Sequence, residues 1–329
     1  MLGIPTHLPS VGKVVVGRQG WILLVDELKY LAYNKPWLSN PGTLEDSPPN
    51  TGVDPLSAIL YFDRELKERG INLIVVPVPV RPLVYPEAVV SLHRFETFPR
   101  VPNLATWQQS FFDHLEINGC RAVDLTPTFL EHRDSDRGPV FLPTESHWTG
   151  YGMVVAGKEI AALVKQQEWY ATSEKRVVDR EWMTVDHTGD LSERLARGLQ
   201  GVEDVPPEIK DVALGPVKMP VRKVMFKHEG DSVAVAARNP GSPVVVVGDS
   251  YVAFGANSGY GLGQQLADEL GIAVDVLSTN AGGANDARMN LIRAAVADPT
   301  YLAGKKCVIW CFASRELVGV EWFPLPFPR

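Results

Sequence analysis

Ser250 stands shortly after an apolar run, at a position where a serine can act as a nucleophile. Val244 to Val247 are four β-branched residues in a row, which predicts a strand buried on both faces. Gly248 and Asp249 then end the apolar run. Open α/β sheets bind ligands outside the carboxyl ends of their strands, so chemistry is expected at Ser250. The alternative interpretation of the same residues is a polar turn after a core strand.

The base and the acid that such a serine needs stand together earlier in the chain. A nucleophilic serine requires a base within hydrogen-bond reach and a third group that orients the base. Glu145 and His147 are separated by one residue, so an extended segment points both side chains to the same side. The carboxylate can then accept from one imidazole nitrogen while the other faces Ser250. A histidine beside a tryptophan can instead be structural, and His187, next to Asp186, is the nearest rival base.

Two further polar clusters follow predicted strands. Gly282 and Gly283 come after the apolar run 272–277, and Arg315 follows a strand expected at 307–312. If these strands are parallel to the one before Ser250, all three clusters lie at one edge of one sheet. The glycine pair permits a turn with exposed N–H groups, hence an oxyanion hole, or else forms an ordinary tight turn.

Alternating helix and strand patterns predict an α/β fold around these clusters. Asp54 and Pro55 are typical of a helix start, Gly70 ends that helix, and 72–77 reads as a buried strand. Residues 170–240 are poorly periodic and are expected to form strands or an insertion rather than an independent domain. The other expected strands are two short ones within 14–24 and one at 121–125. The other expected helices are one through Trp107, Phe111 and Leu115, one after Gly152, one from Ser250 to Leu270 and one at 286–297. Loops are expected at 34–53 and around Tyr85-Pro86-Glu87.

The composition of the 329-residue chain is that of a soluble globular protein, with 45% hydrophobic and 22% charged residues. This length suits one large α/β domain or two smaller ones. The net charge of -7, with no basic stripe, does not favour nucleic acid as a partner, although a local basic groove for another anionic polymer is compatible with it. No apolar run reaches transmembrane length, and the N-terminus lacks the pattern of a signal peptide.

No cofactor and no metal are expected from the sequence. His, Cys and Asp residues do not cluster with metal-ligand spacing, and no Gly-rich phosphate loop precedes a helix. A Gly-x-Ser-x-Gly elbow is missing too, which argues against the common α/β-hydrolase fold. The three cysteines allow at most one internal disulfide. Cys307 and Cys311 would lie about 13 Å apart along one strand, too far to bridge, so buried thiols are expected.

Several of these motifs resemble those of one known family. Gly248-Asp249-Ser250-Tyr251 resembles the first block of the SGNH hydrolase superfamily, and Asn280-Ala281-Gly282-Gly283 resembles the second. Glu145-Ser146-His147-Trp148 precedes the serine, an order that resembles the AlgJ/AlgX-type proteins of alginate O-acetylation, whose motif is usually Asp-x-His-Trp. Further similar segments run in family order: Gly17-Arg18-Gln19-Gly20-Trp21, Pro77-Val78-Pro79, Tyr85-Pro86-Glu87, Gly189-Asp190-Leu191 and Phe312-Ala313-Ser314-Arg315-Glu316-Leu317.

The resemblance implies a three-layer α/β/α fold with a mainly parallel sheet. It also implies a single SGNH-like domain over 1–329, with an insertion at about 170–240 and no appended carbohydrate-binding module, as in the AlgJ type. Glu145 departs from the usual Asp and is one methylene longer, which the pair with His147 is expected to tolerate. Arg315 stands where many SGNH enzymes have an asparagine, so Asn285 is a further, weaker candidate for the oxyanion hole.

The function implied by the resemblance is O-acetyl transfer to an exported polysaccharide through a Ser250–His147–Glu145 acyl-enzyme mechanism. The backbone N–H groups of Ser250 and Gly283 would hold the oxyanion, and Arg315 would contribute charge, favour an acidic sugar or form a structural ion pair. Hydrolysis of acetylated glycans and a catalytically silent polysaccharide-binding module are the alternatives. The expected partners are a polysaccharide acceptor and an acetyl donor delivered by a membrane acyltransferase. The expected location is the periplasm or the exterior, with the export signal or anchor trimmed from this sequence, or the cytoplasm if the chain is complete.

Overall fold

The computed structural model describes residues 10–11, 13–33, 54–90, 104–205, 207–210, 212–228, 231–235 and 238–327. The loop predicted at 34–53 lies outside the described residues. No helix within the described ranges is long and apolar enough to cross a membrane. All three cysteines, Cys120, Cys307 and Cys311, are buried free thiols, and strand geometry had excluded a bridge between Cys307 and Cys311.

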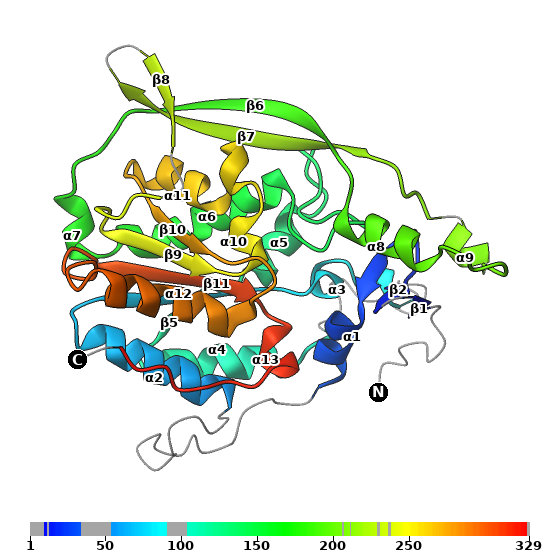
Figure 1. Ribbon diagram of the computed structural model, residues 1–329, viewed down its shortest axis with the longest axis horizontal. Helices are drawn as coiled ribbons and strands as arrows, with labels where there is room; N and C mark the ends of the chain where they lie inside the picture. The colour runs from blue at the N-terminus through cyan, green and yellow to red at the C-terminus, as the bar shows by residue number, and fades with distance from the viewer. Residues whose placement is uncertain are drawn as a thin grey trace.

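A five-stranded, fully parallel sheet forms the centre of the molecule (Figure 1). Its strand order is β10-β9-β11-β4-β5, so the strand that precedes Ser250 lies between two neighbours and is buried on both sides. The register aligns Val247 of β9 with Leu277 of β10 and Trp310 of β11, which brings the three strand ends to one edge. The strands are β4 (Asn72–Val78), β5 (Arg121–Ala122), β9 (Val244–Gly248), β10 (Asp275–Ser278) and β11 (Cys307–Ala313).

Helices cover both faces of this sheet, which confirms the predicted three-layer α/β/α fold (Figure 1). One face carries α2 (Pro55–Lys67), α4 (Gln108–Ile117) and α12 (Gly283–Ala297). The other face carries α6 (Gly150–Lys165) and α11 (Leu262–Leu270), with α5 (Thr126–His132) beside α6. The start of α2 is as predicted, because the carboxylate of Asp54 accepts from the backbone N–H of Ser57 at 3.1 Å.

A small antiparallel sheet and one helix lie beside the main sheet near the N-terminus. The strands are β1 (Ser10–Val11), β2 (Val14–Val16) and β3 (Ile22–Leu24), and α1 (Val25–Ala32) follows them directly. Apolar residues of β2 and β3 pack against Leu191 and Leu195 of a later helix, α8 (Asp190–Gly198). This packing holds the start of α8 close to the 141–149 segment that carries Glu145 and His147.

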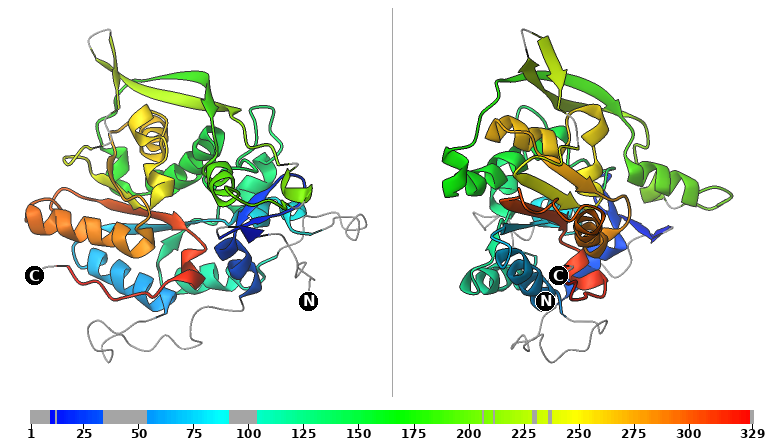
Figure 2. Two further views of the ribbon diagram at one scale, coloured as in Figure 1. Left: turned by 45° about the vertical axis from the view of Figure 1, so that its right-hand side comes forward. Right: turned by 60° about the vertical axis from the view of Figure 1, so that its left-hand side comes forward.

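The poorly periodic segment 170–240 folds mainly as a long antiparallel ribbon (Figures 1 and 2). Its strand β6 (Val178–His187) pairs with β7 (Val217–His228) along ten residues, and β8 (Asp231–Ala234) extends the far end. The ribbon crosses α6 and α11 on the side away from the main sheet. Short helices α7 (Glu168–Ala171) and α9 (Pro207–Lys210) and the longer α8 complete the segment, and β6 ends at His187.

Three elements differ from the sequence-based predictions. The helix expected from Ser250 to Leu270 is broken into α10 (Ser250–Ala253), a 3-10 turn (Ala256–Ser258) and α11, because Gly255 and Gly259 adopt positive φ. The strand expected at 272–277 begins only at Asp275, and the one at 121–125 covers two residues. The segment around Tyr85 is not an extended loop, since α3 (Arg81–Val84) and a 3-10 turn (Pro86–Ala88) form there.

A fully buried ion pair joins the small sheet to the main one. Arg81, which follows β4, binds the carboxylate of Glu27 from α1 through Nε at 3.0 Å and Nη2 at 2.5 Å. The same guanidinium donates to the carbonyl oxygen of Ile22 at 2.8 Å and to that of Glu145 at 2.9 Å. One side chain therefore fixes β3, α1 and the backbone of Glu145 relative to the end of β4.

Arg81→Ala is expected to destabilise the protein by about 3–5 kcal/mol, because it leaves the Glu27 carboxylate buried without its partner. The measurement is urea unfolding monitored by circular dichroism. Lys29→Ala is the control, since Lys29 pairs with Asp26 on the exposed surface and its loss should cost less than about 1 kcal/mol. Equal losses in the two variants would contradict the structural role assigned to Arg81.

Candidate active site

Ser250 lies just beyond the carboxyl end of β9 and is the first residue of α10. The turn is held by Asp249, which is buried beneath it. One carboxylate oxygen of Asp249 accepts from the N–H of Tyr251 at 2.9 Å, and the other accepts from the N–H of Ala313 at 2.8 Å. Ser250 itself is half-buried. The turn that carries the serine is thus tied to the end of β11, the strand that precedes Arg315.

The predicted pairing of Glu145 with His147 is present. Oε1 of Glu145 lies 2.6 Å from Nδ1 of His147 and also accepts the backbone N–H of His147 at 3.0 Å. The carboxylate is almost completely buried, whereas 16% of the imidazole surface is exposed. With Nδ1 bound to the acid, Nε2 is the ring nitrogen left to act as a base.

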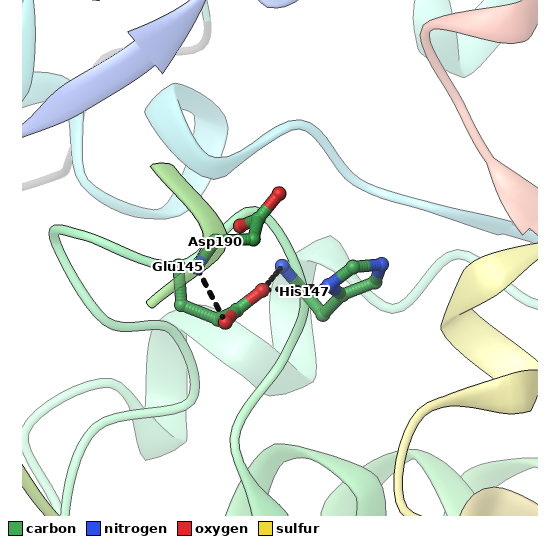
Figure 3. A group of neighbouring side chains, drawn as sticks. All are labelled: Glu145, His147 and Asp190. Atoms are coloured by element: carbon green, nitrogen blue, oxygen red, sulfur yellow. Dashed lines mark hydrogen bonds and ion pairs between the residues drawn. The ribbon is translucent and has the colours of Figure 1, made fainter. Parts of the chain in front are cut away.

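Ring contacts place His147 beside the helix that carries Ser250. The imidazole stacks on Phe254 with 5.1 Å between ring centroids and 8° between planes, and it meets Tyr251 edge-on at 5.2 Å. The backbone carbonyl of Ser250 accepts from the N–H of Phe254 at 2.9 Å. Figure 3 shows the imidazole extending away from the two carboxylates toward the yellow ribbon that contains α10. His147 therefore lies between its acid and the serine helix.

The 144–148 backbone is fixed from several directions. Arg81 holds the carbonyl of Glu145, the hydroxyl of Tyr251 donates to the carbonyl of Ser146 at 2.7 Å, and Nε1 of Trp148 donates to the carbonyl of Tyr251 at 3.2 Å. Trp148 is fully buried. Trp148 thus packs the 144–148 segment, which carries His147, onto α10 instead of facing solvent.

The second oxygen of Glu145 is bound by the turn that joins β6 to α8. Oε2 lies 2.6 Å from Nε2 of His187 and accepts the N–H of Asp190 at 3.2 Å. The carboxylate of Asp190 in turn accepts the backbone N–H of Ser146 at 2.8 Å and its hydroxyl at 2.9 Å. Gly189 must be a glycine, because a Cβ there would collide with the carbonyl of Thr144.

Opposite effects act on the two carboxyl groups of this cluster. Burial alone would raise the pKa of Glu145, but hydrogen bonds from His147 and His187 outweigh it and hold that pKa well below its ordinary value. Burial raises the pKa of Asp190, and the nearby charge of Glu145 raises it further. Glu145 is therefore the group that stays ionised, as an acid that orients a histidine must.

The glycine pair lies at the same sheet edge, at the start of α12. The N–H of Thr279 donates to the carbonyl of Gly248 at 3.0 Å, so the loop begins beside the serine turn. Ser250 and Gly283 are each the first residue of a helix, where a backbone N–H has no acceptor within its own helix. The carboxyl group of Glu316 also packs against Gly283 and accepts from the N–H of Ala284, and its burial raises its pKa.

Arg315 and Asn285 have different surroundings. The guanidinium of Arg315 lies 5.9 Å from the centroid of the Tyr251 ring, beside the serine helix. Asn285 is directed elsewhere, since its amide nitrogen donates to the carbonyl of Glu321 at 2.6 Å and its oxygen accepts from Arg288. The structure therefore keeps Arg315 near the site, whereas the side chain of Asn285 is occupied by the C-terminal segment.

Glu145, His147 and Asp190 are also close enough to be considered as metal ligands, with one ligand atom from each within 4.8 Å of the others. The carboxylate oxygens already receive N–H and O–H donors from the protein, and a hydrogen bond joins Glu145 to His147. A cation would have to displace these donors. The arrangement fits a hydrogen-bonded acid–base group better than a metal centre.

Comparison with known proteins identifies the family. The family described as "SGNH hydrolase-like domain, acetyltransferase AlgX" matches residues 14–314. The chain belongs to this family. The match includes the candidate site residues from Glu145 to Asn285 and ends one residue before Arg315.

Similar proteins of this AlgX family include AlgJ proteins from Pseudomonas. "Probable alginate O-acetylase AlgJ" of Pseudomonas aeruginosa is 24% identical over 183 residues, which are 54% of this chain and 40% of that protein. The protein of the same name from Pseudomonas putida is 22% identical over 312 residues, which are 92% of this chain and 70% of that protein. The chain spans about half the length, or less, of the first three curated relatives it matches.

Two solved structures share the fold. The "O-Acetyltransferase Domain of Pseudomonas putida AlgJ" has a TM-score of 0.63 at 21% identity, covering 94% of this chain and 93% of that one. Pseudomonas aeruginosa AlgX has a TM-score of 0.62 at 17% identity, covering 93% of this chain and 65% of that one. At these identities the likeness establishes the AlgX-family fold.

A groove of about 570 Å³ lies next to α10, on the side of β10 and α12. Ala253 of α10 forms part of its wall, together with Asn280 from the loop that leads to Gly282 and Gly283. The groove is therefore about one helical turn from Ser250. Its polar lining consists of asparagines, arginines and one serine, and no acidic side chain is among the described lining residues: Arg238, Asn257, Ser278, Asn280, Asn290 and Arg293. This feature is called the lateral groove below.

Sequence reasoning missed part of this site. The sequence presents His187 only as a rival base, whereas its ring binds the candidate acid. Asp190 belongs to the similar segment Gly189-Asp190-Leu191, but no local pattern predicts its contact with Ser146. The spacing of His187, Gly189 and Asp190 was the available signal. It could be interpreted only once the fold had placed this turn against Glu145.

Glu145→Gln is expected to destabilise the protein most at neutral pH. The native pKa of Glu145 is lowered, so its stabilising effect is complete above the ordinary value of 4.5 and is lost as the pH falls through the lowered native value. The difference in unfolding free energy between wild type and E145Q should therefore shrink progressively below pH 4.5. Urea unfolding at pH 7 and at several lower pH values measures it, and a difference independent of pH would contradict the assignment.

Proposed function

We propose that this protein is an O-acetyltransferase that acts on an exported polysaccharide, with Ser250 as nucleophile, His147 as base and Glu145 as orienting acid. One observation carries the proposal. The Glu145–His147 hydrogen bond of 2.6 Å leaves the other imidazole nitrogen for the serine helix, against which the ring is stacked. The family assignment supports acetyl transfer as the chemistry. The proposed unit is a single SGNH-like domain over 1–329 with an insertion at about 170–240.

In the first step Ser250 Oγ attacks the carbonyl carbon of an acetyl donor while Nε2 of His147 removes its proton. The tetrahedral intermediate then collapses, and the leaving group departs with the proton returned by His147. Acetyl-Ser250 remains. The Glu145 carboxylate stabilises the imidazolium that forms between the two proton transfers. Positioned general-base catalysis of this kind contributes about 10²–10⁴ to the rate.

In the second step a sugar hydroxyl attacks acetyl-Ser250. His147 takes the proton of that hydroxyl and delivers it to the departing Ser250 oxygen, so the acetyl ester moves to the sugar and the enzyme is regenerated.

In both steps the N–H of Ser250, at the start of α10, is the first proposed oxyanion donor. The N–H of Gly283 and the charge of Arg315 are the others. Losing one such donor typically costs about 10²–10³ in rate.

The lateral groove is the proposed site of the acceptor. Two arginines and three asparagines line it, so it suits a sugar polymer that carries both hydroxyl and carboxylate groups. The relatives named alginate O-acetylases make such an acidic polysaccharide the first substrate to test. The proposed location is the periplasm or the exterior, with the acetyl group supplied through a membrane acyltransferase.

Brief exposure of the wild type to an activated acetyl ester should add one acetyl group to Ser250, because the serine attacks before any acceptor is present. Intact-mass spectrometry followed by peptide mapping measures this adduct. Ser250→Ala should abolish it, and His147→Ala should slow its formation by about 10²–10⁴. Ser258→Ala is the control, since Ser258 belongs to the 3-10 turn after α10 and is exposed.

The fate of the acetyl group then separates the two reactions. Acetylated oligosaccharide formed from the loaded enzyme supports transfer, whereas free acetate in the presence of an acceptor indicates an esterase. If the folded wild type forms no adduct and turns over no ester, the enzyme proposal fails and a polysaccharide-binding module becomes the better interpretation.

Arg293→Ala should raise KM for an acidic oligosaccharide acceptor by about tenfold, because the variant removes one charge-assisted contact from the lateral groove. The rate of acetyl-Ser250 formation should stay unchanged, since the donor reacts at the serine. Steady-state transfer kinetics measure both. Arg64→Ala on α2 removes an exposed arginine that is not among the lining residues of the groove, and an identical change in that variant would indicate a nonspecific charge effect.

A further inference from the structure

The Glu145 carboxylate is shared between two histidines from distant parts of the chain. Oε1 faces Nδ1 of His147 and Oε2 faces Nε2 of His187, each at 2.6 Å. Only 17% of the His187 side chain is exposed, and its ring packs edge-on against Phe254 at 5.6 Å and 87°. The same Phe254 ring stacks on His147. Both imidazoles are therefore held by one carboxylate and one aromatic ring.

Replacing His187 with an apolar residue would leave Oε2 with the N–H of Asp190 as its remaining donor among the described contacts. That bond is longer, at 3.2 Å, and it donates from the start of α8, whose positive end also favours the charged carboxylate. A buried carboxylate oxygen that loses its strongest donor rotates or draws in water. Either response would move Oε1 relative to His147.

His187 contacts a charged cluster. It binds the Glu145 carboxylate, beside which Asp190 and His147 also lie, while Asp186, its neighbour on β6, is exposed and paired with Lys218 at 2.7 Å. The two oxygens belong to one planar group, so a donor that fixes Oε2 also fixes the direction of Oε1. Losing the His187 donor therefore loosens the hydrogen bond between Glu145 and His147.

We propose that His187 is a positioning residue of this active site, which holds Oε2 of Glu145 and thereby fixes the direction of Oε1 toward the base His147. This inference rests on the proposed function for its effect on rate, but the hydrogen-bond geometry itself is a property of the folded protein. It also gives a reason why residue 145 is a glutamate and not the shorter aspartate of the Asp-x-His-Trp motif. The longer side chain bridges two imidazoles that arrive from separate segments.

The test compares His187→Ala, His187→Gln and the control His132→Ala. Gln keeps an N–H donor, and His132 is a partly buried histidine that bonds Tyr151 outside the site. NMR of the proton between Nδ1 of His147 and Glu145, which needs no substrate, is the first measurement. Its signal should lie far downfield in the wild type, move upfield in H187A and move less in H187Q. It should stay unchanged in H132A.

The second measurement is the pH profile of acetyl-Ser250 formation. H187A should lower the rate by about 10- to 100-fold, less than the loss of the base itself, and H187Q should restore most of it. If H187A does not fold, H187Q against wild type decides the question, because its amide reaches Oε2 with a different geometry and should still move the signal. A His147 Nδ1 proton signal at its wild-type position in every folded His187 variant would overturn the inference. If the signal responds to His187 but the wild type forms no acetyl adduct, the proposed function fails and the positioning role of His187 stands.

Discussion

The buried carboxylate of Glu145 is the constraint on which the site depends. An ionised carboxylate can be buried only if donors satisfy both of its oxygens. One oxygen is bound by His147, and the other by His187 and the start of α8. The two donors of the second oxygen lie 42 and 45 residues from Glu145 in the sequence. The ribbon and α8 must therefore dock correctly before the acid and the base can adopt their relative positions.

Two sets of contacts hold the ribbon and α8 in that docked position. Gly189 lets the β6–α8 turn approach so closely that the N–H groups of Leu191 and Ser192 both donate to the carbonyl of Thr144. From the opposite side, Arg81 binds the carbonyl of Glu145 while its charge is neutralised by Glu27. The 144–148 segment, which carries His147, is thus held between the β6–α8 turn on one side and the Arg81–Glu27 pair on the other. Each contact satisfies a polar group that burial would otherwise make unfavourable.

Local patterns predicted the central sheet well, because strands buried on both faces are continuous apolar runs, as in Val244 to Val247. They also predicted the Glu145–His147 pair, since its spacing is local. Three things were not predictable from such patterns. The broken helix after Ser250 depends on positive φ at Gly255 and Gly259, and the role of His187 depends on long-range packing of the ribbon. The side chain of Asn285 is engaged by Glu321, a contact between segments that no local spacing reveals.

Asp249 makes the site rigid, because it ties the serine turn to the end of β11. Because one carboxylate binds the N–H groups of Tyr251 and Ala313, the serine turn and the end of the strand leading to Arg315 move as one body. In the proposed reaction, such a site would undergo little reorganisation when charge develops on the ester. The adjustment needed to reach the reacting atoms then falls on the incoming molecule. A long flexible polymer, in which many equivalent hydroxyl groups can slide past a fixed point, is well suited to a protein built in this way.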